Sequence, residues 1–247
     1  MKKFLKEFSV LASFFLIWEM AVRLLDVPTF ILPTPTEIFL EIYENFYLLM
    51  NHTSITFLET FMGLIIGAFF GLLIALIFAY DKRIKDSIYP YFVTIKTIPI
   101  IALTPLIILW FGHGLVSKIV IVSLACFFPI LVNATKGFLT ITESHRDLFR
   151  SLQVSKLGTF VHLRLPSALP YIFTGLKISV TLAVLGAIVG EFVGSDKGLG
   201  YLMVLSSTYL ETPTLFAAII MTAMIGLILY LIVNYLERKI VFWGREE

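Results

Sequence analysis

The chain has 247 residues, of which 58% are hydrophobic and only 15% are charged, and its mean hydropathy is +0.93. These values exclude an ordinary soluble domain and are typical of a membrane protein. The net charge of +2 does not indicate a nucleic-acid partner, and the single cysteine, Cys126, excludes an internal disulfide or a Cys/His zinc site.

Long apolar runs predict six transmembrane helices. Four of the runs contain no charge, and each is close to the roughly 20 residues that a helix needs to cross a bilayer. The first run contains Glu19 and Arg23, which are four residues apart and can pair on one helical face. The sequence therefore predicts an all-α, polytopic membrane protein, with spans at Phe8–Leu25, Thr60–Tyr80, Thr97–Ser117, Ile119–Thr135, Tyr171–Val193 and Thr212–Leu236.

Basic residues predict the orientation of these spans. With both termini in the cytoplasm, 14 of the 19 lysines and arginines fall on the cytoplasmic side, as the positive-inside rule expects. They lie in the two termini, in the turn at 82–85 and in the loop at 136–164. A basic start before an apolar run also fits a cleaved signal peptide, but no Ala-x-Ala site follows, so we expect an uncleaved first helix.

After the first span, Pro28, Pro33 and Pro35 predict a stiff, extended linker. We expect Thr36 to cap a short amphipathic helix that runs through Tyr47. Such a helix would lie at the membrane surface.

The second span carries three glycines at intervals of four, Gly63, Gly67 and Gly71. Such a stripe allows another helix to approach closely in lipid. We expect this packing to occur within the chain, and a contact between two copies is the alternative.

Pro90, Pro99 and Pro105 interrupt the stretch Tyr89–Phe111 in the third span. Each proline bends or breaks a helix, and a break within a membrane survives only where protein or a water-filled cavity covers the freed carbonyls. A simple kink is the alternative. We predict that this span lines the transport pathway through Thr97, Pro99, Thr104 and Pro105.

A polar, basic segment, Asp147 to Pro166, separates the fourth and fifth spans. Its charges cannot lie in lipid, so we expect it to offer a surface to a soluble partner. We predict one helix from Asp147 to Leu163, with Pro166 as a hard stop. A loop held on the membrane surface by its basic residues is the alternative.

This segment resembles the EAA loop, by which permease subunits of ABC importers dock on their ATPase. The family pattern is Glu-Ala-Ala, three residues, Gly, nine residues, an aliphatic residue, one residue and Leu-Pro. In that register Asp147 replaces the opening Glu and Gln153 replaces Gly, so we expect the bend to be absent or shifted toward Gly158. The resemblance implies an ATPase-coupling site made of Asp147, Phe149, Arg150, Ser151, Leu152, Gln153, Val154, Leu163 and Pro166.

Other motifs resemble the same family. They are Lys96-Thr-Ile-Pro99, Ala102-Leu-Thr-Pro105-Leu, Leu109-Trp-Phe-Gly112, Phe127-Phe-Pro129 with Asn133, and Glu191 followed by Gly198-Leu-Gly200. The resemblance places Asn133 and Glu191 with the pathway or its gate. For Glu191 we favour a role in helix packing, with gating as the alternative.

The resemblance spans Leu32 to about Tyr235 and implies the pathway subunit of a type I ABC importer. The expected solute is of the sulfonate, taurine, nitrate or pyrimidine and thiamine-precursor class. The expected partners are a second copy of the permease, two ATP-binding ABC subunits and an extracytoplasmic substrate-binding protein. The expected location is a bacterial or archaeal inner membrane.

We expect one permease domain, 1–247, with a core at about 55–236 and a coupling segment at 143–166. No Gly-x-x-x-x-Gly-Lys-Ser/Thr motif occurs, so we expect no cofactor in this chain and ATP on the partner subunits. A secondary transporter or channel is the alternative function, but four spans lack the charges that couple ions. No histidine pattern indicates an enzyme.

Overall fold

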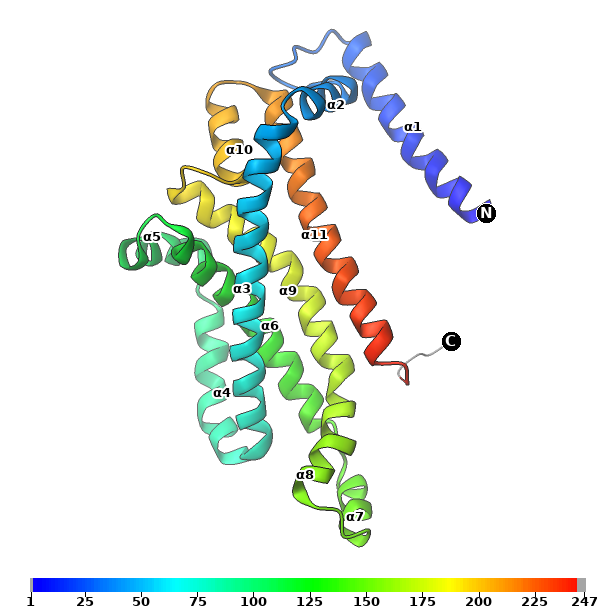
Figure 1. Ribbon diagram of the computed structural model, residues 1–247, viewed down its shortest axis with the longest axis vertical. Coiled ribbons are helices and arrows are strands. Elements are labelled where there is room, and N and C mark those ends of the chain that lie inside the picture. Colours follow the sequence, from blue (N-terminus) through cyan, green and yellow to red (C-terminus); the bar gives the residue numbers. More distant parts are fainter. Residues whose placement is uncertain (1, 244–247) are drawn as a thin grey trace.

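The computed structural model describes residues 2–243, and no strand occurs among them. The long helices α3, α6, α9 and α11 run side by side through the molecule (Figure 1). In chain order the helices are α1 (Lys2–Leu24), α2 (Pro35–Glu44), α3 (Phe46–Tyr80), α4 (Lys82–Lys96), α5 (Ile100–Phe111), α6 (Leu115–Leu139), α7 (Glu143–Ser151), α8 (Lys156–Thr159), the π-helical turn η1 (Phe160–Arg164), α9 (Leu165–Gly194), α10 (Leu199–Thr208) and α11 (Thr212–Ile240).

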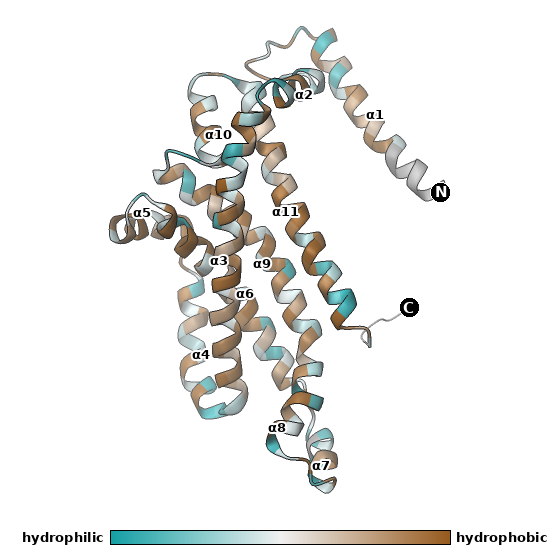
Figure 2. Cartoon of the chain, viewed as in Figure 1, coloured by the Kyte–Doolittle hydropathy of each residue, from teal (hydrophilic) through white to brown (hydrophobic). Residues whose placement is uncertain are grey.

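Of the short helices, α2 and α10 lie at one end of this bundle and α7 and α8 at the other, while α4 and α5 lie at its side (Figure 1). We call the end with α2 and α10 the α10 end, and the opposite end, with α7, α8 and the α3–α4 turn, the α7 end. Hydrophobic residues, in brown, predominate along the long helices between these ends (Figure 2).

Four stretches of residues 2–243 are long and apolar enough to cross a membrane. They are α3, α6, the continuous stretch Lys156–Gly194 and α11. The pair α4 and α5 forms a fifth candidate span, which is broken by a bend of 94°. The predicted all-α polytopic class is confirmed, and the number of about six is approximate because α1 is not among these five.

The glycine stripe of α3 packs against α6. A Cβ atom on Gly67 would lie 2.5 Å from the carbonyl oxygen of Ser123, and one on Gly63 would lie 2.4 Å from the Val122 side chain. Any larger residue would push the two helices apart. The prediction that the stripe packs within the chain is confirmed.

The cap of α2 differs from the prediction. Thr34, not Thr36, is the N-cap, and it forms a capping box with Glu37, while Pro35 occupies the first turn. Thr36 instead donates through its backbone N–H and its hydroxyl to Glu19, at 3.1 and 2.8 Å, and so ties α2 to α1. The helix ends at Glu44 rather than Tyr47, and α3 begins two residues later.

Candidate functional site

The predicted coupling segment is not a single helix. It consists of α7, a turn at 152–155, the short helix α8 and the π-helical turn η1. The Ser155 hydroxyl begins α8 by accepting a hydrogen bond from the Gly158 N–H at 3.0 Å. The prediction of one helix from Asp147 to Leu163 is therefore wrong, because the chain reverses after Ser151.

The reversal occurs at Gln153, whose φ of 53° lies in the left-handed region. The Val154 N–H donates to the Phe149 carbonyl at 3.1 Å, and the Gln153 N–H donates to the Arg150 carbonyl at 2.9 Å. This pair of bonds is the Schellman motif, in which Gly usually takes the place of Gln153. The predicted loss or shift of the bend toward Gly158 is wrong, since the bend keeps its register without glycine.

Pro166 does not stop the helix. It lies in the first turn of α9, and the helical path continues from Lys156 to Gly194 over 39 residues. The π-helical turn just before it, in which the Leu165 N–H donates to the Phe160 carbonyl, widens the backbone. Because Pro166 has no N–H and needs room for its ring, this widened turn lets it continue a helix that a regular turn would interrupt.

The α7 end exposes apolar side chains. Leu148 is 55% exposed, Leu152 is 65% exposed and Leu157 is 73% exposed. Two of the predicted coupling residues pair with each other instead, since Asp147 and Arg150 form an exposed ion pair at 3.4 Å. An apolar surface of this kind at the tip of a polar segment is typical of a protein contact.

The remaining predicted coupling residues have different surroundings. The Ser151 hydroxyl donates within α7, to the Leu148 carbonyl at 2.8 Å. Phe149, Val154 and Leu163 are half-buried. Leu152, by contrast, is exposed at the surface of the turn.

The break in the third predicted span occurs at Pro99 alone. Pro90 and Pro105 lie inside α4 and α5, while Pro99 precedes the first residue of α5. A cavity of about 610 Å³ opens beside the break and is almost entirely apolar. Its lining includes Pro99 together with Phe92, Phe127, Phe128, Ile95, Ile98 and Ile100.

The other predicted pathway residues do not line this cavity. The Thr97 hydroxyl donates to the Thr94 carbonyl at 2.7 Å, and the buried Thr104 hydroxyl donates to the Ile100 carbonyl at 3.1 Å. Asn133 is half-buried and donates through Nδ2 to the Pro129 carbonyl at 2.8 Å. The structure therefore brings only Pro99 of this set to the cavity, and the pathway role of Thr97, Thr104, Pro105 and Asn133 stays a prediction.

Glu191 lies in a buried polar cluster at the α10 end. Its carboxylate accepts hydrogen bonds from the Thr56 hydroxyl at 2.7 Å and from the Gly200 N–H. The Leu199 N–H donates to the same Thr56 hydroxyl at 2.8 Å. Glu191 thus holds the start of α10 against α3, as expected of a residue that serves helix packing.

Two further charged residues of this cluster were not among the predicted site residues. Glu59 is 2% exposed and Lys118 is 1% exposed, and both face Glu191. The Lys118 ammonium donates to the carbonyls of His113 and Gly194. The signal available in the sequence was that each charge stands at the edge of an apolar run, which is rare unless the charge is paired.

The glycines of the Gly198-Leu-Gly200 motif make room for this carboxylate. Gly198 has a φ of +102°, and a Cβ atom there would lie 2.2 Å from the Glu191 carboxyl carbon. A Cβ atom on Gly200 would lie 2.9 Å from Glu191 Oε2. The two glycines therefore let the backbone approach a buried carboxylate closely, and the motif is not a phosphate cradle.

The chain is similar to known transport proteins along almost its whole length. Residues 49–242 match the family described as "Binding-protein-dependent transport system inner membrane component". A protein of Haemophilus influenzae named "Probable ABC transporter permease protein" is 35% identical over 97% of this chain and 98% of its own length.

Two further relatives carry more specific names. The formylaminopyrimidine transport permease protein ThiX of Halalkalibacterium halodurans is 34% identical over 94% of this chain and 92% of its own length. A Bacillus subtilis protein, provisionally named as the aliphatic sulfonates transport permease protein SsuC, is 34% identical over 92% and 83%. The chain belongs to the family of inner membrane components of binding-protein-dependent transport systems, and it is a multi-pass membrane permease.

Proposed function

We propose that two copies of this chain form the membrane pathway of an ATP-driven importer, and that two ATPase subunits dock on their α7 ends. The observation that carries the proposal is the segment from α7 to η1. It presents exposed leucines on a turn whose second arm continues without interruption into the membrane helix α9. ATP is bound by the ATPase subunits, and this chain moves the solute without catalysing a reaction on it.

The α7 end faces the cytoplasm in this proposal, and both termini lie on the same side of the membrane. Lys82, Arg83 and Lys85 begin α4 at the turn that reaches toward this end (Figure 1), and Lys156 begins α8. Positive residues accumulate on the cytoplasmic side of membrane proteins. The α10 end then faces outward and receives the solute from the substrate-binding protein.

The helix Lys156–Gly194 supplies a path for force across the membrane. At a rise of about 1.5 Å per residue, its 39 residues span about 58 Å. A displacement of α8 by the ATPase therefore acts directly on Glu191 and on the loop that follows α9. Closure and reopening of the ATPase pair would tilt this helix as a rigid body and alternate the access of the pathway.

The contact between the two copies forms around the break at Pro99. The half-buried aromatic side chains of Phe92 and Phe128 line the open apolar cavity of about 610 Å³ beside this break. A bent helix within a membrane needs a protein or water lining on its open side. The second copy supplies that lining, and the pathway runs between the two copies past Thr97 and Pro99. The permease then forms one domain over 1–247, with its core at about 55–236 and the coupling segment at 143–166.

The solute of this importer is a small molecule of the kinds that name its relatives, an aliphatic sulfonate or a pyrimidine. A secondary transporter would need a charged group that exchanges ions with both sides. The buried Glu191 and Lys118 are instead bonded to hydroxyl, N–H and carbonyl groups of the chain itself, which favours packing over ion coupling.

The decisive experiment substitutes the exposed leucine of the turn. A buried aliphatic anchor is worth about 1.5–3 kcal/mol, so Leu152→Asp should weaken binding of the purified ATPase by roughly tenfold or more. Substrate-stimulated ATP hydrolysis should fall with it. Lys82→Asp is the control, because it places the same acidic residue in the other turn that reaches toward the α7 end. Docking and hydrolysis unchanged in Leu152→Asp would show that this segment is not the coupling element.

A further inference from the structure

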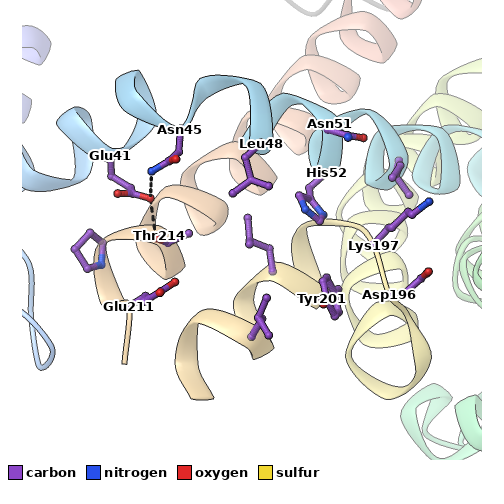
Figure 3. A pocket seen from close by; sticks show the side chains of 14 residues that line it. Glu41, Asn45, Leu48, Asn51, His52, Asp196, Lys197, Tyr201, Glu211 and Thr214 are labelled. Atoms are coloured by element: carbon purple, nitrogen blue, oxygen red, sulfur yellow. Dashed lines mark hydrogen bonds between the residues drawn. The ribbon is translucent and has the colours of Figure 1, made fainter. Parts of the chain in front are cut away.

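A second, larger cavity opens at the α10 end, away from the break and the coupling segment. Its volume is about 860 Å³, and five separate segments of the chain contribute to it (Figure 3). They are α2, the start of α3, the loop between α9 and α10, α10 itself and the start of α11. A concave site in which polar groups converge from several elements is the usual form of a small-molecule site.

The lining is acidic. Glu41, Asp196 and Glu211 contribute three carboxylates, and Lys197 is the one lysine among the described residues that line the cavity. The N-terminus of α11 also opens here and would attract an anion with about half a positive charge. Glu211 is already the N-cap residue of that helix, so a full carboxylate charge outweighs the dipole. An anion entering this cavity would be repelled.

One wall presents hydrogen-bond acceptors. The Glu41 Oε1 atom accepts from Asn45 Nδ2 at 2.9 Å and from the Thr214 hydroxyl at 2.7 Å, and these bonds fix the carboxylate in place (Figure 3). Among the described residues no hydrogen bond reaches its second oxygen. A fixed carboxylate beside the amide of Asn45 suits a ligand with N–H groups, because such a ligand can donate to both.

The opposite wall is aromatic. His52 and Tyr201 stack with their ring centroids 6.0 Å apart and an angle of 25° between their planes. The Gly198 N–H donates to His52 Nδ1 at 3.0 Å, so a neutral imidazole carries its proton on Nε2. Both rings line the cavity beside Leu48 and Leu202, which gives this wall an apolar surface for a flat ring.

We infer that this cavity binds a neutral or protonated nitrogen heterocycle that carries amino groups, and that it does not bind a sulfonate or another anion. The inference rests on the proposed function, since it takes the α10 end as the side from which solute enters. It selects the pyrimidine class from the kinds of solute considered above. The loop with Asp196 and Lys197 follows directly after α9, so movement of that helix would reshape the site during transport.

The experiment introduces a reactive cysteine into the cavity of the full-length chain in right-side-out membrane vesicles. Asn51→Cys places the thiol in the lining, and Tyr209→Cys places one at an exposed position of the same end outside the cavity. The native Cys126 is buried and does not compete. A cationic methanethiosulfonate should react with Asn51→Cys about tenfold faster than an anionic one, whereas Tyr209→Cys should show no such preference.

Protection then tests the ligand class. Millimolar 2,4-diaminopyrimidine should slow labelling of Asn51→Cys several-fold and leave Tyr209→Cys unaffected, and Glu211→Gln should reduce the protection. Ethanesulfonate should give none. Equal protection by ethanesulfonate, protection by neither compound, or equal protection by the solute-free binding protein would overturn the inference. ATPase docking is measured on inside-out vesicles from the same cells, which expose the α7 end. Loss of docking would count against the proposed function, and docking without protection would overturn only the ligand site.

Discussion

At the α10 end the chain buries charges, and Glu59, Lys118 and Glu191 are each at most 2% exposed. At the α7 end it exposes apolar groups, and Leu152 and Leu157 are 65% and 73% exposed. The first arrangement lies within one chain, because hydroxyl, N–H and carbonyl groups of the chain bind Glu191 and Lys118, while Glu59 Oε2 has no hydrogen-bond partner among the described residues. The exposed leucines of the second arrangement contribute no free energy of burial until a partner covers them. We call the α10 end the rigid end, because its buried charges need no partner protein, and the α7 end the unfinished end, because its exposed leucines need one. The same helix, Lys156–Gly194, joins the two ends.

Removal of the buried cation, the Lys118 ammonium, should destabilise the rigid end. Lys118→Met leaves Glu59 and Glu191 buried without a positive neighbour, and loss of one member of a buried ionic group typically costs about 3–5 kcal/mol. The midpoint of thermal unfolding of the purified chain in detergent should fall accordingly. The double substitution Lys118→Met with Glu59→Gln should recover part of the loss, because it also removes one carboxylate.

Lys197→Met is the matched control for this effect. Lys197 is exposed and lies in the loop at the same end, so its substitution should change the free energy of unfolding by less than about 0.5 kcal/mol. If Lys118→Met unfolds at the same temperature as Lys197→Met, the cluster does not hold this end together, and the contrast with the α7 end disappears.

The unfinished end depends on its turn. Gln153 adopts a φ of 53°, which costs a residue with a side chain about 1–2 kcal/mol and costs glycine almost nothing. Gln153→Gly should therefore hold the turn at least as well as the native residue. Gln153→Val should destabilise the turn and weaken ATPase binding by about fivefold to thirtyfold.

Titration of the purified ATPase against each variant measures this effect, and the opposite signs of the two substitutions provide the control. Equal affinity in Gln153→Val, Gln153→Gly and the native chain would show that the turn does not present the contact. The stability of the isolated permease should change little, because α7 packs loosely on the rest of the chain.

The local features of the chain could be predicted from the sequence with partial success. The spacing back from Pro166 aligned Gln153 with the glycine of the family pattern, but the prediction that the bend is absent or shifted toward Gly158 was wrong, because the turn closes through backbone hydrogen bonds that do not require glycine. The same reasoning could not decide which of three prolines breaks the third span. Pro90 and Pro105 stay within helices, since loss of one backbone bond is tolerated where neighbouring helices support the rest.

The sites that join distant segments could not be predicted. Glu59, Lys118 and Glu191 are separated by about sixty residues or more at each step, and nothing local indicates that their helices meet. The acidic cavity collects its residues from five segments, and its net charge appears only after they are assembled. Sequence patterns identify which groups are unusual, and only the packing of α3 on α6 and α9 identifies which of them are neighbours.

The smallest expected effect concerns the cap of α2 at the rigid end. The backbone N–H of Thr34 donates to the Glu37 carboxylate at 2.7 Å, and this bond, with those from the Thr34 and Thr29 hydroxyls, holds the pKa of Glu37 below its usual value of 4.5. A carboxyl whose pKa is lowered by folding stabilises the fold above its unfolded pKa, and this contribution is lost as the pH falls through the folded value. Glu37→Gln should therefore lower the free energy of unfolding by about 0.5–1 kcal/mol at neutral pH, and the difference from the native chain should close as the pH falls below about 4.5.

Glu44→Gln removes the same charge from the other end of α2 and controls for net charge. The unfolding temperatures of the three chains are measured between pH 7 and pH 3. If the difference in unfolding temperature between the native chain and Glu37→Gln stays constant with pH, the charge of this carboxylate does not stabilise the cap.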